Sequence, residues 1–462
     1  MSKYTKSPNT DFLCETKKYP PTLFDVTPVC KKPIEIGFTA ERVSSDGGLL
    51  LLREVERQCG MLMAITNCIG EGRHPSYIQH SLHSMLTQRV FQIAAGYEDA
   101  NDCDTLRDDM IMKICADVAP ESGNPLSSQP TMSRFENSLS HSELYKIAVA
   151  FVDHFIQSYS KEPSVIILDC DDTNSNTYGA QQLSLFNDYY GEYCYMPLHI
   201  YEGLSGKLIT TILKPGRRSK TANVFAVLSR IIVRLRHVWK NTIIIVRGDG
   251  HFCSRELMAW AKQQDKVHFL TGLTGNKLLN ELARITIDSA ENQFKVTGKP
   301  VKRYHSFEYA AGSWDALQRV IVKVEVSAKG TNIRYVVTDI RCVRTKALYE
   351  QGYCARGQME LYIKESKTHL DSDRMSCSRF EANQFRLFMH SAAYVLLHAL
   401  RSETLRATGY ANATMKTIRL RLIKVAAYVK EMKTRIKIEF PKQFPEMDVL
   451  ANCLSIFNVL RC

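Results

Sequence analysis

The chain has 462 residues, of which 45% are hydrophobic and 23% charged, the balance of a globular protein that buries a sizeable core. These proportions exclude wholesale disorder and collagen-like repeats, and no uncharged apolar stretch approaches the roughly 18 residues that a membrane span needs. Sixty Lys and Arg against 48 Asp and Glu leave a net charge of +12, which suggests a polyanionic partner.

The N-terminal segment is expected to be a flexible arm. Residues 1–37 are polar and rich in Pro, and they lack the apolar core of a signal peptide. The 14 cysteines contain no Cys-x-x-Cys pair or zinc-type cluster, so we expect reduced thiols in a cytoplasmic protein and no structural zinc.

Residues 38–160 are predicted to form a helical, DNA-binding part. Three segments carry apolar residues at three-to-four spacing: Leu49–Val55, Ile78–Ala95 and Ser142–Ile156. A further helix is expected after Ser128, with Pro130 in its first turn. Its Arg134 would suit a recognition helix that contacts DNA, and simple capping of a packing helix is the alternative.

Residues 161–274 are predicted to form a mixed α/β sheet, the first part of a core. An apolar strand, Ser164–Leu168, runs into Asp169-Cys170-Asp171-Asp172, and a second, Thr242–Arg247, runs into Gly248-Asp249-Gly250. The other elements expected here are a hairpin, two helices and a third strand: Glu192–Ile200 with Lys207–Leu213, Ala222–Trp239, Ser254–Lys262 and Val267–Thr271.

Residues 275–345 are predicted to be a β-rich insertion. Its expected strands are Phe294–Thr297, Tyr304–Tyr309, Arg319–Val326 and Ile333–Asp339. Helices Lys346–Ser366 and Arg379–Leu400 then form the second part of the core over 346–402. Residues 403–462 are expected to be a basic helical region that contains a helix over Met415–Lys433.

Basic side chains gather in two segments. Residues 203–248 hold ten basic and no acidic residues, and residues 401–462 hold twelve basic against five acidic. Two long segments of one sign favour binding to a phosphate backbone over solvated helix faces. The candidate contacts to DNA are Arg217, Arg218, Arg230 and Arg234 in the first segment and Arg419 and Lys424 in the second.

The helix predicted over 346–366 carries a mixed polar stripe. Tyr353, Arg356, Glu360 and Lys367 lie at i, i+3, i+7 and i+14. At about 100° per residue these positions fall within about 60° of one another on the helix surface. The alternative is an ordinary solvated face of ion pairs.

Acidic residues at two strand ends and on this helix can converge at one edge of the sheet. Carboxylates held close together repel unless divalent cations neutralise them, and hard oxygen ligands favour Mg²⁺ or Mn²⁺. Period-2 alternation places Asp169 and Asp171 on one strand face, so either could be a ligand. His251 could lie near such a site or simply cap a turn.

These motifs together resemble DDE-type insertion-sequence transposases of bacteria. The resemblance rests on Asp171-Asp172-Thr173, on Arg247-Gly248-Asp249-Gly250-His251 and on the Y-x2-R-x3-E-x6-K signature from Tyr353 to Lys367. It extends over about residues 38–440. The sequence departs from the family at Tyr178, where relatives often have His, so no role is inferred for that position.

The resemblance implies a ribonuclease-H-like core and cut-and-paste transposition. Asp171, Asp249 and Glu360 would bind two Mg²⁺ or Mn²⁺ ions per active site, with Asp171 preferred over Asp169 because it fits the family's D-x-T pattern. Tyr353, Arg356 and Lys367 would contact phosphates of the cleaved end.

The partners implied are double-stranded DNA, as transposon terminal inverted repeats and as target, and a second copy of the chain in a synaptic homodimer. The protein would be associated with the bacterial nucleoid and would bind no membrane. No nucleotide cofactor is expected, because the glycines of 272–277 lack phosphate-loop spacing. The alternatives are an inactive, transposase-derived DNA-binding regulator and a two-metal nuclease.

Overall fold

The computed structural model describes residues 27–32, 34, 36, 39–217 and 222–459. The flexible arm predicted over 1–37 therefore lies almost wholly outside the described residues, as does Arg218. Within the described ranges, no helix combines the length and the apolar character that crossing a bilayer requires.

Five strands form the centre of the fold. In spatial order they are β7 (Leu208–Ile212), β6 (Leu198–Glu202), β2 (Val165–Asp172), β8 (Ile243–Gly248) and β9 (Val267–Leu273). Strands β2, β8 and β9 run parallel, whereas β6 is antiparallel to both β2 and β7. This order and these directions are those of a ribonuclease-H-like sheet, which confirms the predicted fold class.

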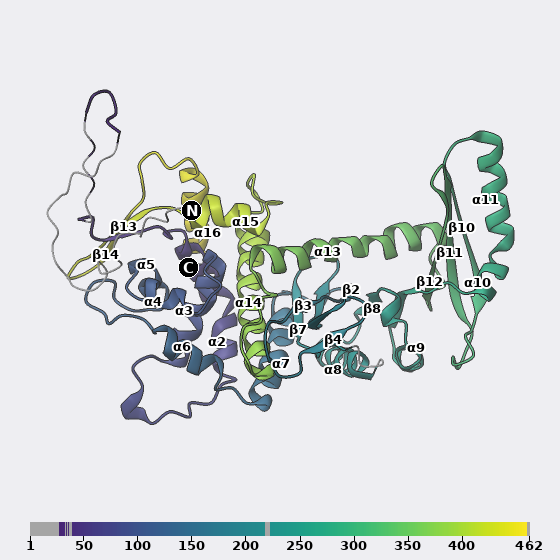
Figure 1. Cartoon of the computed structure of the whole chain (residues 1–462), viewed down its shortest axis with the longest axis horizontal. Coiled ribbons are helices and arrows are strands. Elements are labelled where there is room, and N and C mark those ends of the chain that lie inside the picture. The colour runs from purple at the N-terminus through teal and green to yellow at the C-terminus, as the bar shows by residue number, and fades with distance from the viewer. Residues whose placement is uncertain (1–26, 33, 35, 37–38, 218–221, 460–462) are drawn as a thin grey trace, which may run out of the picture.

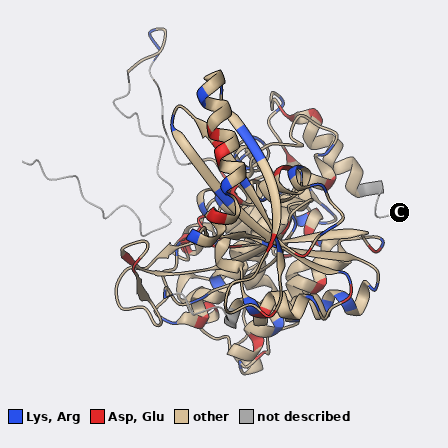
Figure 2. Cartoon of the chain, turned by 90° about the vertical axis from the view of Figure 1, so that its right-hand side faces the viewer, with Lys and Arg blue, Asp and Glu red and all other residues tan. Residues whose placement is uncertain are grey.

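The insertion lengthens this sheet. Strands β12 (Gly330–Thr338), β11 (Gln318–Ser327) and β10 (Val301–Tyr309) continue it from β9, all antiparallel, to give eight strands. The strand predicted at Phe294–Thr297 is wrong. It is the end of helix α11 (Arg284–Thr297), which follows α10 (Lys277–Leu282) and is terminated by Gly298 at a φ of 66°. Figure 2 shows basic and acidic residues interspersed over the insertion.

The two faces of β2 have different partners. Ile166, Leu168 and Cys170 are buried in a core shared with α7 (His141–Gln157), α8 (Ala222–Val238) and α9 (Arg255–Ala261). The alternate residues, Asp169 and Asp171, face the other side, along which a long helical segment runs (Figure 1).

That helical segment extends from Thr345 to His369. It contains α12 (Thr345–Ala347) and α13 (Gly357–Lys364), joined by π-helical and 3₁₀ turns over 348–356, and it ends in a π-helical turn over 365–369. The predicted helix over 346–366 is confirmed. Because π turns hold more residues than α turns, the predicted uniform step of about 100° does not apply along its length.

A helical layer packs around α14 (Phe380–Ala399), most of which is buried. The predicted helices are confirmed as α1 (Leu49–Cys59), α3 (Leu82–Ala95) and α7. They share one hydrophobic core with α14 and with C-terminal residues. The remaining helices of this layer are α2 (Met61–Thr66), α4 (Asp102–Leu106), α5 (Met110–Cys115), α6 (Gln129–Glu136) and α16 (Met447–Val459).

The helix predicted over Met415–Lys433 is wrong beyond Ile423. After α15 (Met415–Ile418) and a π-helical turn over 419–423, the chain forms β13 (Ala427–Glu431), which pairs with β1 (Val43–Ser44) and with β14 (Ile436–Glu439). Buried and exposed residues alternate along β13 because successive side chains point to opposite faces, and only the face of Ala427 and Val429 packs on the core.

A second small sheet is formed by the part of the chain that connects β2 to β6. It consists of β3 (Ser175–Asn176), β5 (Glu192–Tyr195) and β4 (Leu185–Asn187), with β5 in the middle. The single strand predicted over Glu192–Ile200 is therefore divided at Met196-Pro197 between two sheets, since Pro has no N–H to donate to a ladder.

Candidate active site

Two aspartates lie side by side at the ends of neighbouring parallel strands. Cys170 of β2 is opposite Gly248 of β8 in the register, so Asp171 and Asp249 each directly follow a paired residue. The sequence produces this arrangement because each apolar run forms a buried strand, and an aspartate follows at the point where that strand emerges from the core. The two carboxylates therefore meet at one edge of the sheet.

The environment of Asp171 reflects this proximity. Burial is the main cause that raises the pKa of the Asp171 carboxyl, to about 6. The Arg356 guanidinium opposes the shift, and the negative charge of Asp249 adds to it. The carboxylates are thus near enough to repel, and a cation between them would relieve that repulsion.

Arg356 connects the helical segment to the sheet edge that carries Asp171 and Asp249, which we call the acidic edge. Its Nη1 lies 3.1 Å from Oδ2 of Asp171, and both side chains are less than one fifth exposed. Burial alone would lower the pKa of Arg356, but the attraction of Asp171, Asp249 and Glu360, together with Tyr353, raises it. All three acidic residues of the predicted triad therefore interact electrostatically with one guanidinium. Glu360 follows one helical turn later and is exposed.

Asp249 is held by His251. The backbone N–H of His251 donates to Oδ1 of Asp249 at 2.8 Å, and His251 Nδ1 lies 2.7 Å from Oδ2. Asp249 caps the short 3₁₀ turn Gly250–Phe252 in this way. The capping residue of this turn is thus Asp249 and not His251, whose ring contacts the Asp249 carboxylate.

Asp169 belongs to a separate, buried ion pair. Arg247 on β8 donates from Nε to Oδ1 of Asp169 at 2.5 Å and from Nη2 to Oδ2 at 2.6 Å, and both side chains are at most 1% exposed. A Cβ at Gly203 would come within 2.6 Å of both partners, so glycine is required there. Both oxygens of Asp169 are thus engaged inside the sheet, whereas Asp171 on the same face contacts Arg356 of the helical segment.

Arg247 is a functional residue that the sequence reasoning missed. Its Nη1 donates to the backbone carbonyl of Gly352, so one side chain links β2, β8 and the helical segment. The sequence does contain a sign of this pair. An arginine at the end of a predicted buried strand needs a carboxylate partner, and Asp169 directly follows another predicted strand. The contacts of Arg247 with Asp169 and Gly352 therefore hold the helical segment in place over the acidic edge.

Tyr353 and Lys367 also turn toward the sheet. A Cβ at Gly272 would lie 2.7 Å from the Tyr353 hydroxyl, so the ring packs closely over β9. Lys367 Nζ donates to the carbonyl of Asn174 at 2.7 Å and lies 3.8 Å from Asp373. Together with Arg356, these side chains surround the strand ends that carry the two aspartates.

The carboxylates of Asp171, Asp249 and Glu360 are suitable ligands for a hard divalent cation, but they are not yet arranged around one. Within the described ranges, no three His, Cys, Asp or Glu side chains are already arranged to hold a metal ion. Asp171 and Asp249 contact Arg356 and His251 instead. Carboxylate oxygens are the ligands that Mg²⁺ and Mn²⁺ prefer, so binding would require these internal contacts to be exchanged.

The other predicted DNA contacts fall into two groups. Arg134, Arg217 and Arg230 are exposed. Arg234 instead forms a two-pronged ion pair with Asp153 of α7, at 2.7 and 2.8 Å. That pair joins α8 to α7, so the charge of Arg234 is already matched within the protein.

The two predicted contacts from the C-terminal region have internal partners. Arg419 donates to the backbone carbonyls of Ala94 at 2.9 Å and of His369. Lys424 lies 2.7 Å from the fully buried carboxylate of Asp46 and 3.7 Å from the centre of the Tyr97 ring. These side chains hold helix ends and a loop together, which leaves no basis for assigning them to DNA.

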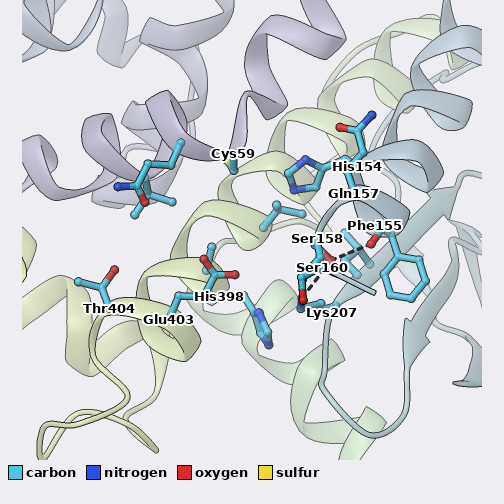
Figure 3. A pocket seen from close by; sticks show the side chains of 15 residues that line it. Cys59, His154, Phe155, Gln157, Ser158, Ser160, Lys207, His398, Glu403 and Thr404 are labelled. Atoms are coloured by element: carbon cyan, nitrogen blue, oxygen red, sulfur yellow. Dashed lines mark hydrogen bonds between the residues drawn. The ribbon is translucent and has the colours of Figure 1, made fainter. Parts of the chain in front are cut away.

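A cavity of about 400 Å³ lies away from this edge, among α1, α7, β7 and α14 (Figure 3). Two of its basic side chains are bound within the protein. Lys207 Nζ donates to the carbonyl and hydroxyl of Ser158 at 2.9 and 3.0 Å, and His398 Nε2 lies 3.0 Å from the carbonyl of Ser205. None of the three predicted acidic residues lines it.

A ribonuclease-H-like sheet with aspartates at two strand ends and a glutamate on a later helix is the arrangement of DDE transposases. The chain belongs to this class. The model of the family described as Transposase DDE domain group 1 matches residues 26–462, which confirms the resemblance inferred from the sequence. No curated protein matches the chain.

Among solved structures, the fold is similar to the cryo-EM structure of the piggyBac transposase synaptic complex with hairpin DNA. The identity is 13%, the match covers 83% of this chain and 81% of that chain, and the TM-score is 0.41.

Proposed function

We propose that the protein is an active transposase that cleaves and transfers DNA strands in cut-and-paste transposition of an insertion sequence. The observation that carries this proposal is the pairing of Asp171 and Asp249 at one sheet edge, beneath the helical segment that presents Arg356 and Glu360. Membership of the transposase family supports the same reaction class.

In this proposal, Asp171, Asp249 and Glu360 hold two Mg²⁺ or Mn²⁺ ions. When bound, such ions activate a water or a 3′-hydroxyl and stabilise the leaving oxygen of the phosphodiester. Arg356 would exchange its contact with Asp171 for a phosphate of the DNA end, and Lys367 would contact the same strand as a point charge.

The proposed partner is double-stranded DNA, both as the terminal repeats of the element and as the target. Exposed Arg134, Arg217 and Arg230 are available for its phosphates, whereas Arg234, Arg419 and Lys424 are not included. We further propose that two copies of the chain bring two DNA ends together.

The proposal is tested with the purified full chain and a plasmid that carries its coding region with the flanking DNA. We expect excision and strand-transfer products in Mg²⁺ or Mn²⁺, and EDTA should stop cleavage while a gel-shift complex persists. Binding without cleavage in either metal would identify a DNA-binding regulator, and nicking without joined products would identify a nuclease.

Replacing Arg356 by Gln should weaken binding to the DNA ends. It should also lower the slope of log affinity against log salt by about 1, because one phosphate contact is lost. Without DNA, the same variant should bind Mn²⁺ more tightly than the wild type does, since Asp171 loses a competing cation.

Lys346→Gln is the matched control, because this side chain lies at the start of the same helical segment and is 69% exposed. Binding isotherms at several salt concentrations and calorimetric titration with Mn²⁺ measure both effects. An unchanged salt slope in Arg356→Gln would remove the phosphate contact from the proposal.

A further inference from the structure

The small sheet formed by β3, β5 and β4 carries an exposed aromatic face close to the acidic edge. Phe186 of β4 and Tyr193 of β5 are directly opposite each other in the ladder, with ring centroids 5.5 Å apart, and they are 45% and 60% exposed. Tyr178 and Tyr189, in the loops that flank these strands, are 82% and 80% exposed. We call the pair Phe186 and Tyr193 the aromatic platform.

The rest of the small sheet is well anchored, so the exposure is not a sign of a loose loop. Cys194 and Tyr195 of β5 are fully buried, and the Tyr195 hydroxyl donates to the carbonyl of Gln182 at 2.6 Å. Glu192 points to the opposite face, where Asn174 and Asn176 donate to it at 2.7 and 2.8 Å. The platform is therefore a fixed surface.

The platform is connected to the proposed catalytic edge. Strand β3 begins only four residues after Asp171, and Lys367 Nζ donates to the carbonyl of Asn174 within that connection. Gln181 Nε2 donates to the carbonyl of Met375 at 2.6 Å, which fixes the sheet to the chain that follows the helical segment. These two contacts tie the small sheet to the helical segment and to the chain that follows it.

An exposed arginine follows a residue that is packed against the small sheet. The carbonyl of Gly216 accepts a hydrogen bond from Asn187 Nδ2 at 2.7 Å, and a Cβ at Gly216 would lie 2.0 Å from the carbonyl oxygen of Cys194. This contact holds the chain against the small sheet, and the next residue, Arg217, is exposed. Aromatic rings together with basic side chains are the elements that bind single-stranded nucleic acid.

We propose that the aromatic platform stacks unpaired bases of the DNA strand at the proposed active site, with Arg217 on its phosphates. Tyrosine and phenylalanine faces accept any base by stacking, so the site would be tolerant of sequence. This inference rests on the proposed function for the identity of the strand, but its test needs neither metal nor cleavage.

The test is fluorescence anisotropy with the full chain and a labelled 20-nucleotide oligothymidylate, without divalent metal. We expect Tyr193→Ala to weaken binding by about 5- to 100-fold, as loss of one stacking contact does, and Tyr193→Phe to stay within about twofold because the ring remains. Ile285→Ala is the control, since Ile285 is 83% exposed and lies on α11 of the insertion, which is not assigned to DNA.

Each outcome is decisive. Equal affinities of Tyr193→Ala and wild type, or no binding of the oligonucleotide by the wild type, would overturn the inference and leave the cleavage experiments unaffected. A change from dimer to monomer by light scattering, with unchanged DNA affinity, would overturn it in favour of a protein interface. If Tyr193→Ala fails to fold by circular dichroism, Phe186→Leu, which keeps an apolar side chain but removes the ring, replaces it with the same expectation.

Discussion

Glu360→Gln is expected to abolish DNA cleavage and strand transfer while binding to the DNA ends stays within about twofold of wild type. The substitution keeps the size of the side chain but removes a negative oxygen ligand, and a divalent cation needs that charge at a site built from carboxylates. Glu360 is exposed and follows Arg356 by one turn of the helical segment, so the variant should fold normally.

The control for Glu360→Gln is Glu350→Gln on the same helical segment. Glu350 accepts a hydrogen bond from the Tyr304 hydroxyl at 2.8 Å and lies at the side of the insertion. It should cleave like wild type. Cleavage by denaturing gel and binding by gel shift measure the two effects, and a parallel loss of binding and cleavage in Glu360→Gln would argue against a role in metal binding.

Asp169→Asn is expected to lower the free energy of unfolding by about 3–5 kcal/mol, since it leaves the Arg247 guanidinium buried without a counter-charge. Urea denaturation measures the loss. The helical segment should also be less well fixed, because Arg247 bonds the carbonyl of Gly352 only while its fork is held by Asp169.

The control for Asp169→Asn is Asp315→Asn at the surface. Asp315 also binds an arginine through both oxygens, at 2.6 and 3.1 Å from Arg255, but both side chains are more than half exposed. Asp315→Asn should leave the free energy of unfolding nearly unchanged, because water and salt screen an exposed ion pair. A stable Asp169→Asn variant that no longer cleaves DNA would instead make Asp169 a metal ligand.

The elements that the sequence predicted well are those whose pattern is set by burial. The apolar strands before Asp171 and Asp249 are long enough to be recognised in isolation, and the mixed sheet follows from their alternation with amphipathic helices. The expected positions of Tyr353, Arg356 and Glu360 on one helical segment also follow from local periodicity, even though π turns alter the angles between them.

The wrong predictions concern segments whose local sequence is compatible with both a helix and a strand. Ala427–Glu431 contains residues that fit a helix or a strand, and it is a strand because β1 and β14 offer their edges to it. Phe294–Thr297 has β-forming residues but completes α11, whose preceding turns pack on β10 and β11. In both cases the structure depends on the strands that the segment contacts, and β1 and β11 among them are not adjacent to it in the chain.

The sequence by itself determined the family, the fold class and the two strand ends at which carboxylates meet. Local apolar runs show which segments are buried strands and at which residue each of them ends. Only the tertiary structure decided which arginine pairs with each aspartate of β2. Asp169 and Asp171 share one strand face, and Arg247, 78 residues further along the chain, pairs with the first and leaves the second to Arg356. It likewise assigned Arg419 and Lys424 to internal partners, since a charge counted along a chain does not show which side chains the fold has already matched.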